Sequence, residues 1–181
     1  MVKNRKLSVE ELNRVSVTEY KGAVKMPVVV ILDNVRSLNN IGSIFRTSDA
    51  LGIMKICLCG ISATPPHPEI HRTALGAEDS VEWAYYEKTE DAFLHLKNDG
   101  YSVFSLEQTT DSIDLRKFIP QKGAKYAFVF GNELKGVSQT VIDQCDGALE
   151  IPQFGTKHSF NVSVTAGIVL WDFFTKLDSH L

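Results

Sequence analysis

Two short loops in the last third of the chain carry the residues best suited to binding a small molecule. One runs from Gly131 to Gly136 after the apolar run 126–130, and the other begins at Ile151 and includes Gly155. In open α/β sheets, ligands bind where strands end and helices begin, and glycine lets the backbone approach a ligand closely. A lone glycine is better explained by a tight turn, but three glycines after two neighbouring strands predict one shared site.

Three short motifs occur in order along the chain. They are Asn40-Ile41-Gly42 with Arg46, Gly131-Asn132-Glu133-Leu134-Lys135-Gly136, and Ile151-Pro152-Gln153-Phe154-Gly155 followed by Ser159-Phe160-Asn161-Val162-Ser163. These motifs resemble those of the SpoU/TrmH branch of the SPOUT class, whose members are RNA ribose 2′-O-methyltransferases that use S-adenosylmethionine. The resemblance covers about residues 28–174, and the family more often has leucine at position 160 and methionine at position 153.

The resemblance implies that S-adenosylmethionine is the cofactor and that the two glycine loops hold it. Gly131, Ile151 and Phe160 stand at family positions that contact the cofactor, largely through backbone groups. Ser159 belongs to the same third motif, and Leu106 ends a predicted strand at the same edge of the sheet. We therefore expect these five residues to line the cofactor pocket.

Four polar residues of the motifs form the expected catalytic group: Arg46, Asn40, Glu133 and Asn161. Methyl transfer to a ribose hydroxyl needs a closely positioned nucleophile. A guanidinium is too basic to accept a proton, so Arg46 is expected to bind a phosphate and stabilise the developing oxyanion. The proton acceptor stays open. So does the role of Glu133, which can order its loop, orient Arg46 or contact RNA.

Simpler structural explanations exist for two of these residues. Arg46 can form a surface ion pair with Asp49 or Asp33. Asn40, like Asn39, can cap the helix predicted to follow it, because asparagine is a preferred N-cap residue. The capping explanation for Asn40 is compatible with a place near the substrate.

RNA is the expected partner, with tRNA favoured over rRNA and guanosine favoured as the methylated nucleotide. The preference for tRNA rests on the lack of an appended folded RNA-binding domain, which often marks rRNA enzymes of this family. Arg36, His71 and Arg72 are candidate phosphate contacts. A non-catalytic RNA-binding protein of the same fold is an alternative, disfavoured by the intact motifs. A nicotinamide dehydrogenase is disfavoured because no Gly-x-Gly-x-x-Gly follows the first strand.

The charge of the chain is unevenly distributed. The 181 residues have a formal net charge of −3, yet the first 25 carry six basic and three acidic side chains. We divide the chain into a basic N-terminal extension, residues 1–25, predicted to be partly helical, and a methyltransferase domain, residues 26–181. The basic excess is open to two interpretations, an RNA-contacting arm or a solvated tail.

Composition also indicates where the protein works. No apolar run approaches the about 20 residues of a membrane span, and the start of the chain lacks the apolar segment of a signal peptide. Cys57, Cys59 and Cys145 are odd in number, which favours reduced thiols in a cytoplasmic protein. Nothing in the sequence supplies further ligands beside Cys57 and Cys59, so no metal is expected.

Hydrophobic patterns predict an alternation of strands and helices. The alternation indicates an α/β fold whose mostly parallel sheet has helices on both faces, and the resemblance implies a SPOUT-type fold with a trefoil knot at its carboxyl end. A helix at 7–15 is expected from a capping box of Ser8 and Glu11. The remaining elements are strands at 28–32, 54–59, 81–86, 101–106, 126–130 and 148–151, and helices at 41–51, 69–75, 89–98 and 139–144.

The last helix is apolar around most of its circumference. Phe160, Val164, Ile168 and Trp171 mark one face, and further apolar residues follow on the others. A helix of this kind is buried on two sides. At the end of the chain the second side is expected to meet a partner subunit, so a homodimer through this helix is predicted.

Overall fold

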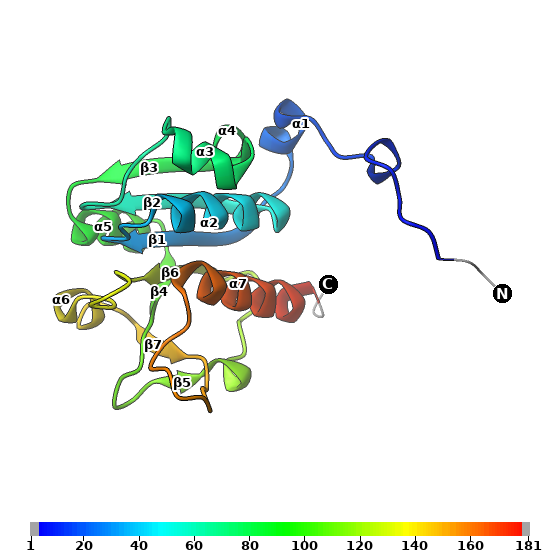
Figure 1. The fold of residues 1–181 in the computed structure, drawn as a ribbon. Coiled ribbons are helices and arrows are strands. Elements are labelled where there is room, and N and C mark those ends of the chain that lie inside the picture. The colour runs from blue at the N-terminus through cyan, green and yellow to red at the C-terminus, as the bar shows by residue number, and fades with distance from the viewer. Residues whose placement is uncertain (1–3, 179–181) are drawn as a thin grey trace.

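The fold is built on a seven-stranded sheet in which every strand pairing is parallel (Figure 1). The computed structural model describes residues 4–178, and Lys3 of the basic extension lies outside them. The predicted parallel α/β sheet is confirmed, with one additional short strand, β5. The order is β3-β2-β1-β6-β4-β7-β5, with β1 Met26–Asp33, β2 Ile53–Cys59, β3 Glu82–Tyr86, β4 Tyr101–Leu106, β5 Ile113–Asp114, β6 Lys125–Phe130 and β7 Gly147–Glu150.

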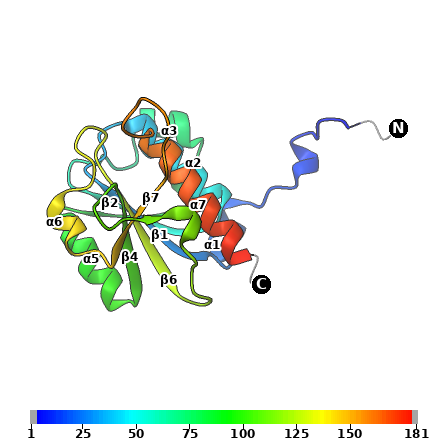
Figure 2. The same ribbon diagram turned by 90° about the horizontal axis from the view of Figure 1, so that it is seen from below.

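Helices cover both faces of the sheet, as predicted (Figure 2). Successive side chains of a strand point to opposite faces, so Val28 and Val30 join one apolar cluster and Val29 and Ile31 the other. These four residues are at most 1% exposed, as the continuous β-branched run predicts. The helices are α2 Leu38–Ala50, α3 Pro68–Ala74, α4 Ala77–Ser80 and α7 Val162–Asp178 on one face, and α5 Thr89–Asn98 and α6 Gln139–Ile142 on the other.

The carboxyl ends of β6, β4 and β7 lie side by side at one edge of the sheet. Ser105 of β4 pairs with Val129 of β6, and Leu106 of β4 pairs with Leu149 of β7. The loops that follow β6 and β7 therefore start on either side of the end of β4. This register brings the two predicted binding loops to one place.

The predicted helix at 7–15 was wrong. Only a 3₁₀ turn, η1 (Glu10–Leu12), forms there, although Ser8 and Glu11 make both hydrogen bonds of the predicted capping box. The turn buries no residue and ends at Asn13, which has a left-handed φ of 47°. A short helix without tertiary packing is marginal in water, so a capping box alone does not extend it.

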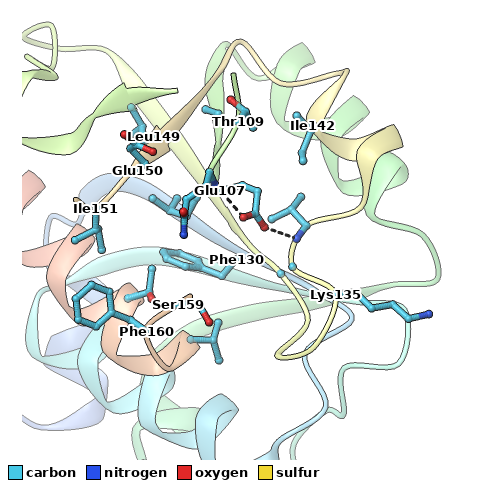
Figure 3. A pocket seen from close by; sticks show the side chains of 18 of the residues that line it. Glu107, Thr109, Phe130, Lys135, Ile142, Leu149, Glu150, Ile151, Ser159 and Phe160 are labelled. Carbon is cyan, nitrogen blue, oxygen red and sulfur yellow. Dashed lines mark hydrogen bonds between the residues drawn. The ribbon is translucent and has the colours of Figure 1, made fainter. Parts of the chain in front are cut away.

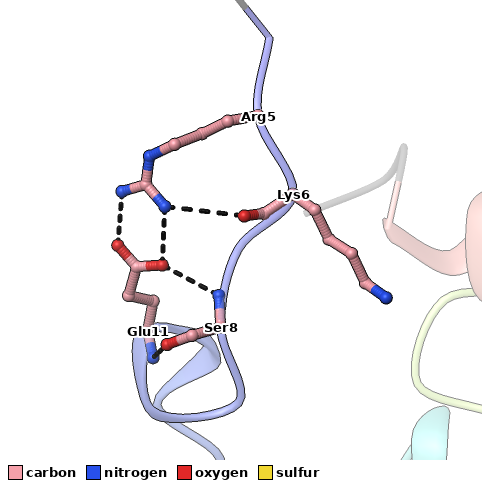
Figure 4. A network of polar contacts seen from close by, with 4 residues as sticks. All are labelled: Arg5, Lys6, Ser8 and Glu11. Carbon is pink, nitrogen blue, oxygen red and sulfur yellow. Dashed lines mark hydrogen bonds and ion pairs between the residues drawn. The ribbon is translucent and has the colours of Figure 1, made fainter.

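The helix of the extension is instead α1 (Val17–Gly22), which has its own complete capping box. The Tyr20 hydroxyl donates to the Ser48 carbonyl of α2 at 3.4 Å, and the Lys25 ammonium lies 3.0 Å from the centre of the Tyr20 ring. These contacts fasten α1 to the domain, whereas residues 4–15 project from it (Figure 1). Within the projecting part, Arg5 forms an exposed ion pair with Glu11 at 2.5 Å, which offsets part of the basic excess (Figure 4).

The buried face of α7 differs from the face that the sequence suggested. Val162, Ala166, Val169, Leu170 and Phe173 are at most 9% exposed and pack on the sheet and α2. On the predicted face, Val164 is 49% and Trp171 57% exposed. Because the helix is apolar on both sides, the pattern alone could not tell which side meets the sheet.

The 3₁₀ turn η2 (Leu115–Lys117) directly follows β5. Its Leu115 carbonyl accepts a hydrogen bond of 2.6 Å from the Lys176 ammonium of α7. The contact holds the end of α7 against the segment that follows β5.

Candidate active site

A cavity of about 1170 Å³ opens at the edge where β4, β6 and β7 end (Figure 3). Its walls are the three loops that follow these strands, together with the start of α7 and one side of α6. All five residues predicted to hold a cofactor line it, namely Leu106, Gly131, Ile151, Ser159 and Phe160. The register of the strands is the reason that residues so far apart in sequence meet here.

The loop 131–137 folds tightly on itself along one wall. Backbone hydrogen bonds of 3.0 and 2.8 Å join Asn132 and Gly136 in both directions. An added Cβ at Gly131 would collide with the backbone of Gly136 and Val137. Gly136 has a φ of +68°, a conformation that favours glycine. Gly131 and Gly136 are therefore required by the loop itself.

Gly155, the third glycine of the predicted pattern, is not constrained in this way. No atom lies within 4 Å of an added Cβ, and its φ is not in the left-handed region. The protein alone gives no reason for glycine at this position.

Glu107 is a cavity residue that the sequence analysis missed. One carboxylate oxygen accepts from the Val137 N–H at 3.1 Å, and the other accepts from the Gln108 N–H at 2.9 Å. The same carboxylate occupies the space that a side chain at Gly136 would fill. An acidic residue directly after a strand that ends at a predicted ligand site was the signal available in the sequence.

Three of the four predicted catalytic residues form one hydrogen-bonded chain. The Glu133 carboxylate accepts from the Asn40 amide at 3.0 Å, and the Asn40 amide oxygen accepts from the Asn161 amide at 3.1 Å. The Ser163 hydroxyl lies 3.4 Å from the same Asn40 oxygen. The chain joins one residue from each of the three motifs, and Glu133 and Asn161 also line the cavity.

The Glu133 carboxylate also binds the start of α2. It accepts from the backbone N–H groups of Arg36 at 3.0 Å and Ser37 at 2.9 Å. Partial burial raises the pKa of this carboxyl, but the three hydrogen bonds to its charged form outweigh burial and leave the pKa below its ordinary value. The side chain thus fixes the loop between β1 and α2 against the glycine loop.

The side chains of Asn40 and Asn161 have different roles at the starts of α2 and α7. The predicted caps of α2, Asn39 and Asn40, were wrong, because Ser37 caps the helix by accepting from the Asn40 N–H at 3.3 Å. The Asn40 side chain is consequently available for Glu133. The Asn161 side chain accepts from the Ser163 N–H at 2.9 Å and so orders the first turn of α7.

Arg46 does not join this group. It is exposed on α2 and lines a second cavity of about 500 Å³ together with Gly167 and Trp171 of α7. Within residues 4–178, Arg46 forms neither of the ion pairs considered from the sequence. Asp49 instead accepts from the Ser80 hydroxyl, and the buried Asp33 accepts from the Thr89 hydroxyl.

The three candidate phosphate contacts lie outside the main cavity. Arg36 is exposed in the loop before α2. The Arg72 guanidinium donates to the Asn39 amide oxygen at 2.9 Å, and His71 lies 2.6 Å from the Glu78 carboxylate. Arg36 and Arg72 therefore flank the amino-terminal end of α2, near the Glu133 chain but not within it.

The described part of the chain, residues 4–178, holds neither a membrane-spanning helix nor a cluster of metal ligands. None of its helices is long and apolar enough to cross a membrane. Its histidine, cysteine and acidic side chains form no group of three or more that could hold a metal ion.

Comparison with known proteins identifies the family. The model of the SpoU rRNA Methylase family matches residues 27–171. A tRNA (guanosine(18)-2′-O)-methyltransferase of Thermus thermophilus is 32% identical over 145 residues, which cover 80% of this chain and 73% of that protein. The chain belongs to the SpoU rRNA Methylase family.

Solved structures agree with this membership. The A. aeolicus TrmH/SpoU tRNA modifying enzyme matches with a TM-score of 0.79 at 23% identity, covering 91% of this chain and 83% of its own, which shows the shared fold. An AdoMet-bound rRNA methyltransferase from Sinorhizobium meliloti matches with a TM-score of 0.77 at 27% identity, covering 90% of this chain and 60% of its own.

The two glycine loops give a matched pair of variants. We expect Gly131→Ala to distort the loop and lower the affinity of the cavity for S-adenosylmethionine at least tenfold, because the new Cβ meets backbone and not a flexible side chain. Gly155→Ala should bind as the wild type does, since its Cβ enters open space. Isothermal titration calorimetry measures both, and equal affinities of the two variants would contradict this account of Gly131.

Glu133→Gln should destabilise the protein by about 1 kcal/mol at pH 7, because an amide cannot accept all three hydrogen bonds. The folded pKa of Glu133 is lowered, so its contribution is complete above the unfolded pKa of about 4.3 and is lost as the pH falls through the folded value. Urea unfolding at pH 7 and about pH 3 should therefore show the difference from wild type shrinking in acid.

Glu82→Gln is the control for this measurement, because Glu82 makes only a surface ion pair of 3.4 Å with Lys55. Its effect should stay below about 0.5 kcal/mol at both pH values. A Glu133→Gln effect that is the same at both pH values would show that the carboxylate charge is not the source of the stabilisation.

Proposed function

We propose that this protein is an S-adenosylmethionine-dependent RNA methyltransferase that acts on a ribose 2′-hydroxyl, with tRNA the favoured substrate. The observation that carries the proposal is the hydrogen-bonded chain of Asn40, Glu133 and Asn161, of which Glu133 and Asn161 line the cavity. It joins all three family motifs in one place. The names of the relatives, which include tRNA and rRNA methyltransferases, support the reaction class.

The cavity suits the cofactor in its chemistry and its size. Leu106, Ile151 and Phe160 offer apolar surface for a purine ring, and the loop 131–137 offers backbone groups. About 1170 Å³ exceeds the roughly 1,000 Å³ upper range of small-molecule sites. The space is thus large enough for the cofactor and part of a substrate nucleotide. When bound, S-adenosylmethionine supplies the electrophilic methyl group.

The residues of the chain supply position and charge stabilisation. Glu133 and Asn40 hold the start of α2 against the glycine loop, while Asn161 holds the start of α7. These contacts keep the cavity walls fixed before the substrate arrives, which is the condition for an effective displacement. Arg46 is assigned to the phosphate beside the reacting ribose, where its guanidinium stabilises negative charge.

Arg46 is separated from the cavity of its own subunit, so this role requires a homodimer. The exposed apolar face of α7, with Val164 and Trp171, adjoins Arg46 across the second cavity. Burying this face against a second subunit would place Arg46 at the interface between two chains. The catalytic site is then composite, with Arg46 acting beside the partner's cavity.

Two further features complete the proposal. The trefoil knot is supported by α7, which packs between α2 and the segment after β5, and by a 2.8 Å hydrogen bond from the Gln108 amide to the His158 carbonyl that joins the loops after β4 and β7. A cytoplasmic location is supported by the three free thiols, since disulfides are rare in the reducing cytosol.

The RNA target defines the alternatives. The same chemistry on rRNA is favoured by the S. meliloti structure, and tRNA by the T. thermophilus relative. A non-catalytic RNA-binding protein of the same fold is the remaining alternative, against which stand the intact Arg46 and the Glu133 chain.

Arg46→Ala tests the reaction. Total RNA from cells with and without the protein would be mapped for ribose 2′-O-methyl groups, and a methyl group in the tRNA fraction should depend on the protein. In vitro, the wild type should restore this methyl group, and Arg46→Ala should restore it about 10²–10³ times more slowly. S-adenosylmethionine affinity should be unchanged. Lys88→Ala, on the other side of the sheet, is the control, and no methyl group dependent on the wild type would refute the function.

Trp171→Glu tests the dimer. Sedimentation velocity at micromolar concentration should show a dimer for the wild type and a monomer for the variant, because a buried unpaired charge is costly. Leu94→Glu on α5, where Leu94 is also exposed, should stay dimeric. A monomeric wild type that methylates RNA would overturn both the dimer and the composite site.

A further inference from the structure

The charged side chains that line the main cavity are mostly acidic. Among the described residues there are five carboxylates and one lysine: Glu107, Asp111, Glu133, Asp143, Glu150 and Lys135. Asp111 accepts from the Thr110 hydroxyl, Asp143 from the Gln139 amide, and Glu133 is committed to the α2 loop. Glu107 and Glu150 are the remaining two carboxylates of the cavity.

Glu107 and Glu150 stand at the ends of neighbouring strands. Leu106 pairs with Leu149, and the Glu107 N–H donates to the Leu149 carbonyl at 3.1 Å, so the two glutamates follow at the next position of each strand. Like charges at facing positions of a sheet are unfavourable. Both side chains line the cavity (Figure 3), and both are only partly exposed.

Neither Glu107 nor Glu150 is neutralised by an ion pair within the described chain. Within residues 4–178 neither carboxylate forms an ion pair, and the Glu150 carboxylate makes no hydrogen bond. On its other side Glu150 pairs in register with Asp114 of β5, whose carboxylate is bound by Arg116 at 2.6 Å. Glu107 accepts two backbone N–H groups, which use about half of the lone pairs of a carboxylate.

We propose that Glu107 and Glu150 make the cavity selective for a cationic ligand, so that S-adenosylmethionine binds more tightly than its demethylated product. The inference rests on the proposed function and concerns the same site. The sulfonium of S-adenosylmethionine is positive, whereas the thioether of S-adenosylhomocysteine is neutral. Two carboxylates without ion-pair partners in a partly enclosed cavity favour binding of the positively charged cofactor. This electrostatic attraction is lost once the methyl group has left and the sulfur is neutral.

The consequence for the reaction is a directional exchange of ligands. Loss of the positive charge on sulfur removes the attraction to Glu107 and Glu150, which favours release of the product and binding of fresh cofactor. The two glutamates act on ligand specificity and do not touch the reacting ribose, so they are specificity residues and not catalytic ones.

Glu150→Gln is the cleanest test, because it removes a charge without removing an intramolecular hydrogen bond. Calorimetry would measure three ligands: S-adenosylmethionine, S-adenosylhomocysteine, and sinefungin, in which a protonated amine replaces the sulfonium. The affinities for the two cations should fall about fivefold, the effect of one charge pair about 4 Å apart in water. The affinity for S-adenosylhomocysteine should change less than twofold.

Glu107→Gln should lower the preference for the cations in the same direction, with some loss for all three ligands because one backbone N–H loses its acceptor. Glu87→Gln, at the far end of the sheet beyond β3, is the control and should change none of the affinities. Added EDTA should also change nothing, and a requirement for a divalent metal would overturn the inference by showing that the carboxylates serve a metal.

Failure of this inference is distinguishable from failure of the proposed function. Wild-type protein that binds neither S-adenosylmethionine nor S-adenosylhomocysteine would overturn both. Wild-type protein that binds both ligands, with Glu150→Gln lowering the two affinities equally or not at all, would overturn only the selectivity.

Discussion

The bridge that Asn40 makes between Glu133 and Asn161 is the contact on which the site depends. Each of the three loops at this edge of the sheet is polar and would move independently if only its own turn held it. The Asn40 amide can donate on one side and accept on the other, so one side chain links the loop after β6 to the start of α7. Because Asn40 itself is buried in the first turn of α2, the bridge is fixed to the domain core.

Much of this arrangement was predictable from local patterns. The β-branched run at 28–32 predicted a strand buried on both faces, and the alternation of elements predicted the parallel sheet. The motif residues of the two glycine loops were expected at one cavity, and they meet there because β4, β6 and β7 end in register. Local sequence determines where strands end, and parallel pairing then aligns those ends.

The cap of α2, the buried side of α7 and the role of Glu107 could not be predicted, because each is decided by tertiary contacts and not by the local sequence. Ser37, Asn39 and Asn40 are all capable caps of α2, and Ser37 prevails while Glu133 engages Asn40. The side of α7 that meets the sheet is decided by packing against Phe128 and α2, not by periodicity. Glu107 has no motif around it, and its role emerges only when the fold brings Gly136 to its carboxylate.

The order of the strands also governs how the chain reaches this structure. At the centre of the sheet β1 lies between β2 and β6, and Val28 pairs with Tyr126, which is nearly a hundred residues further on. Until β6 has been synthesised, one edge of β1 presents an apolar strand with unpaired backbone groups, a template for association with other chains. Pairings of this sequence separation slow folding. The register that aligns the binding loops therefore also makes the nascent N-terminal half of the chain the segment most in need of protection by chaperones.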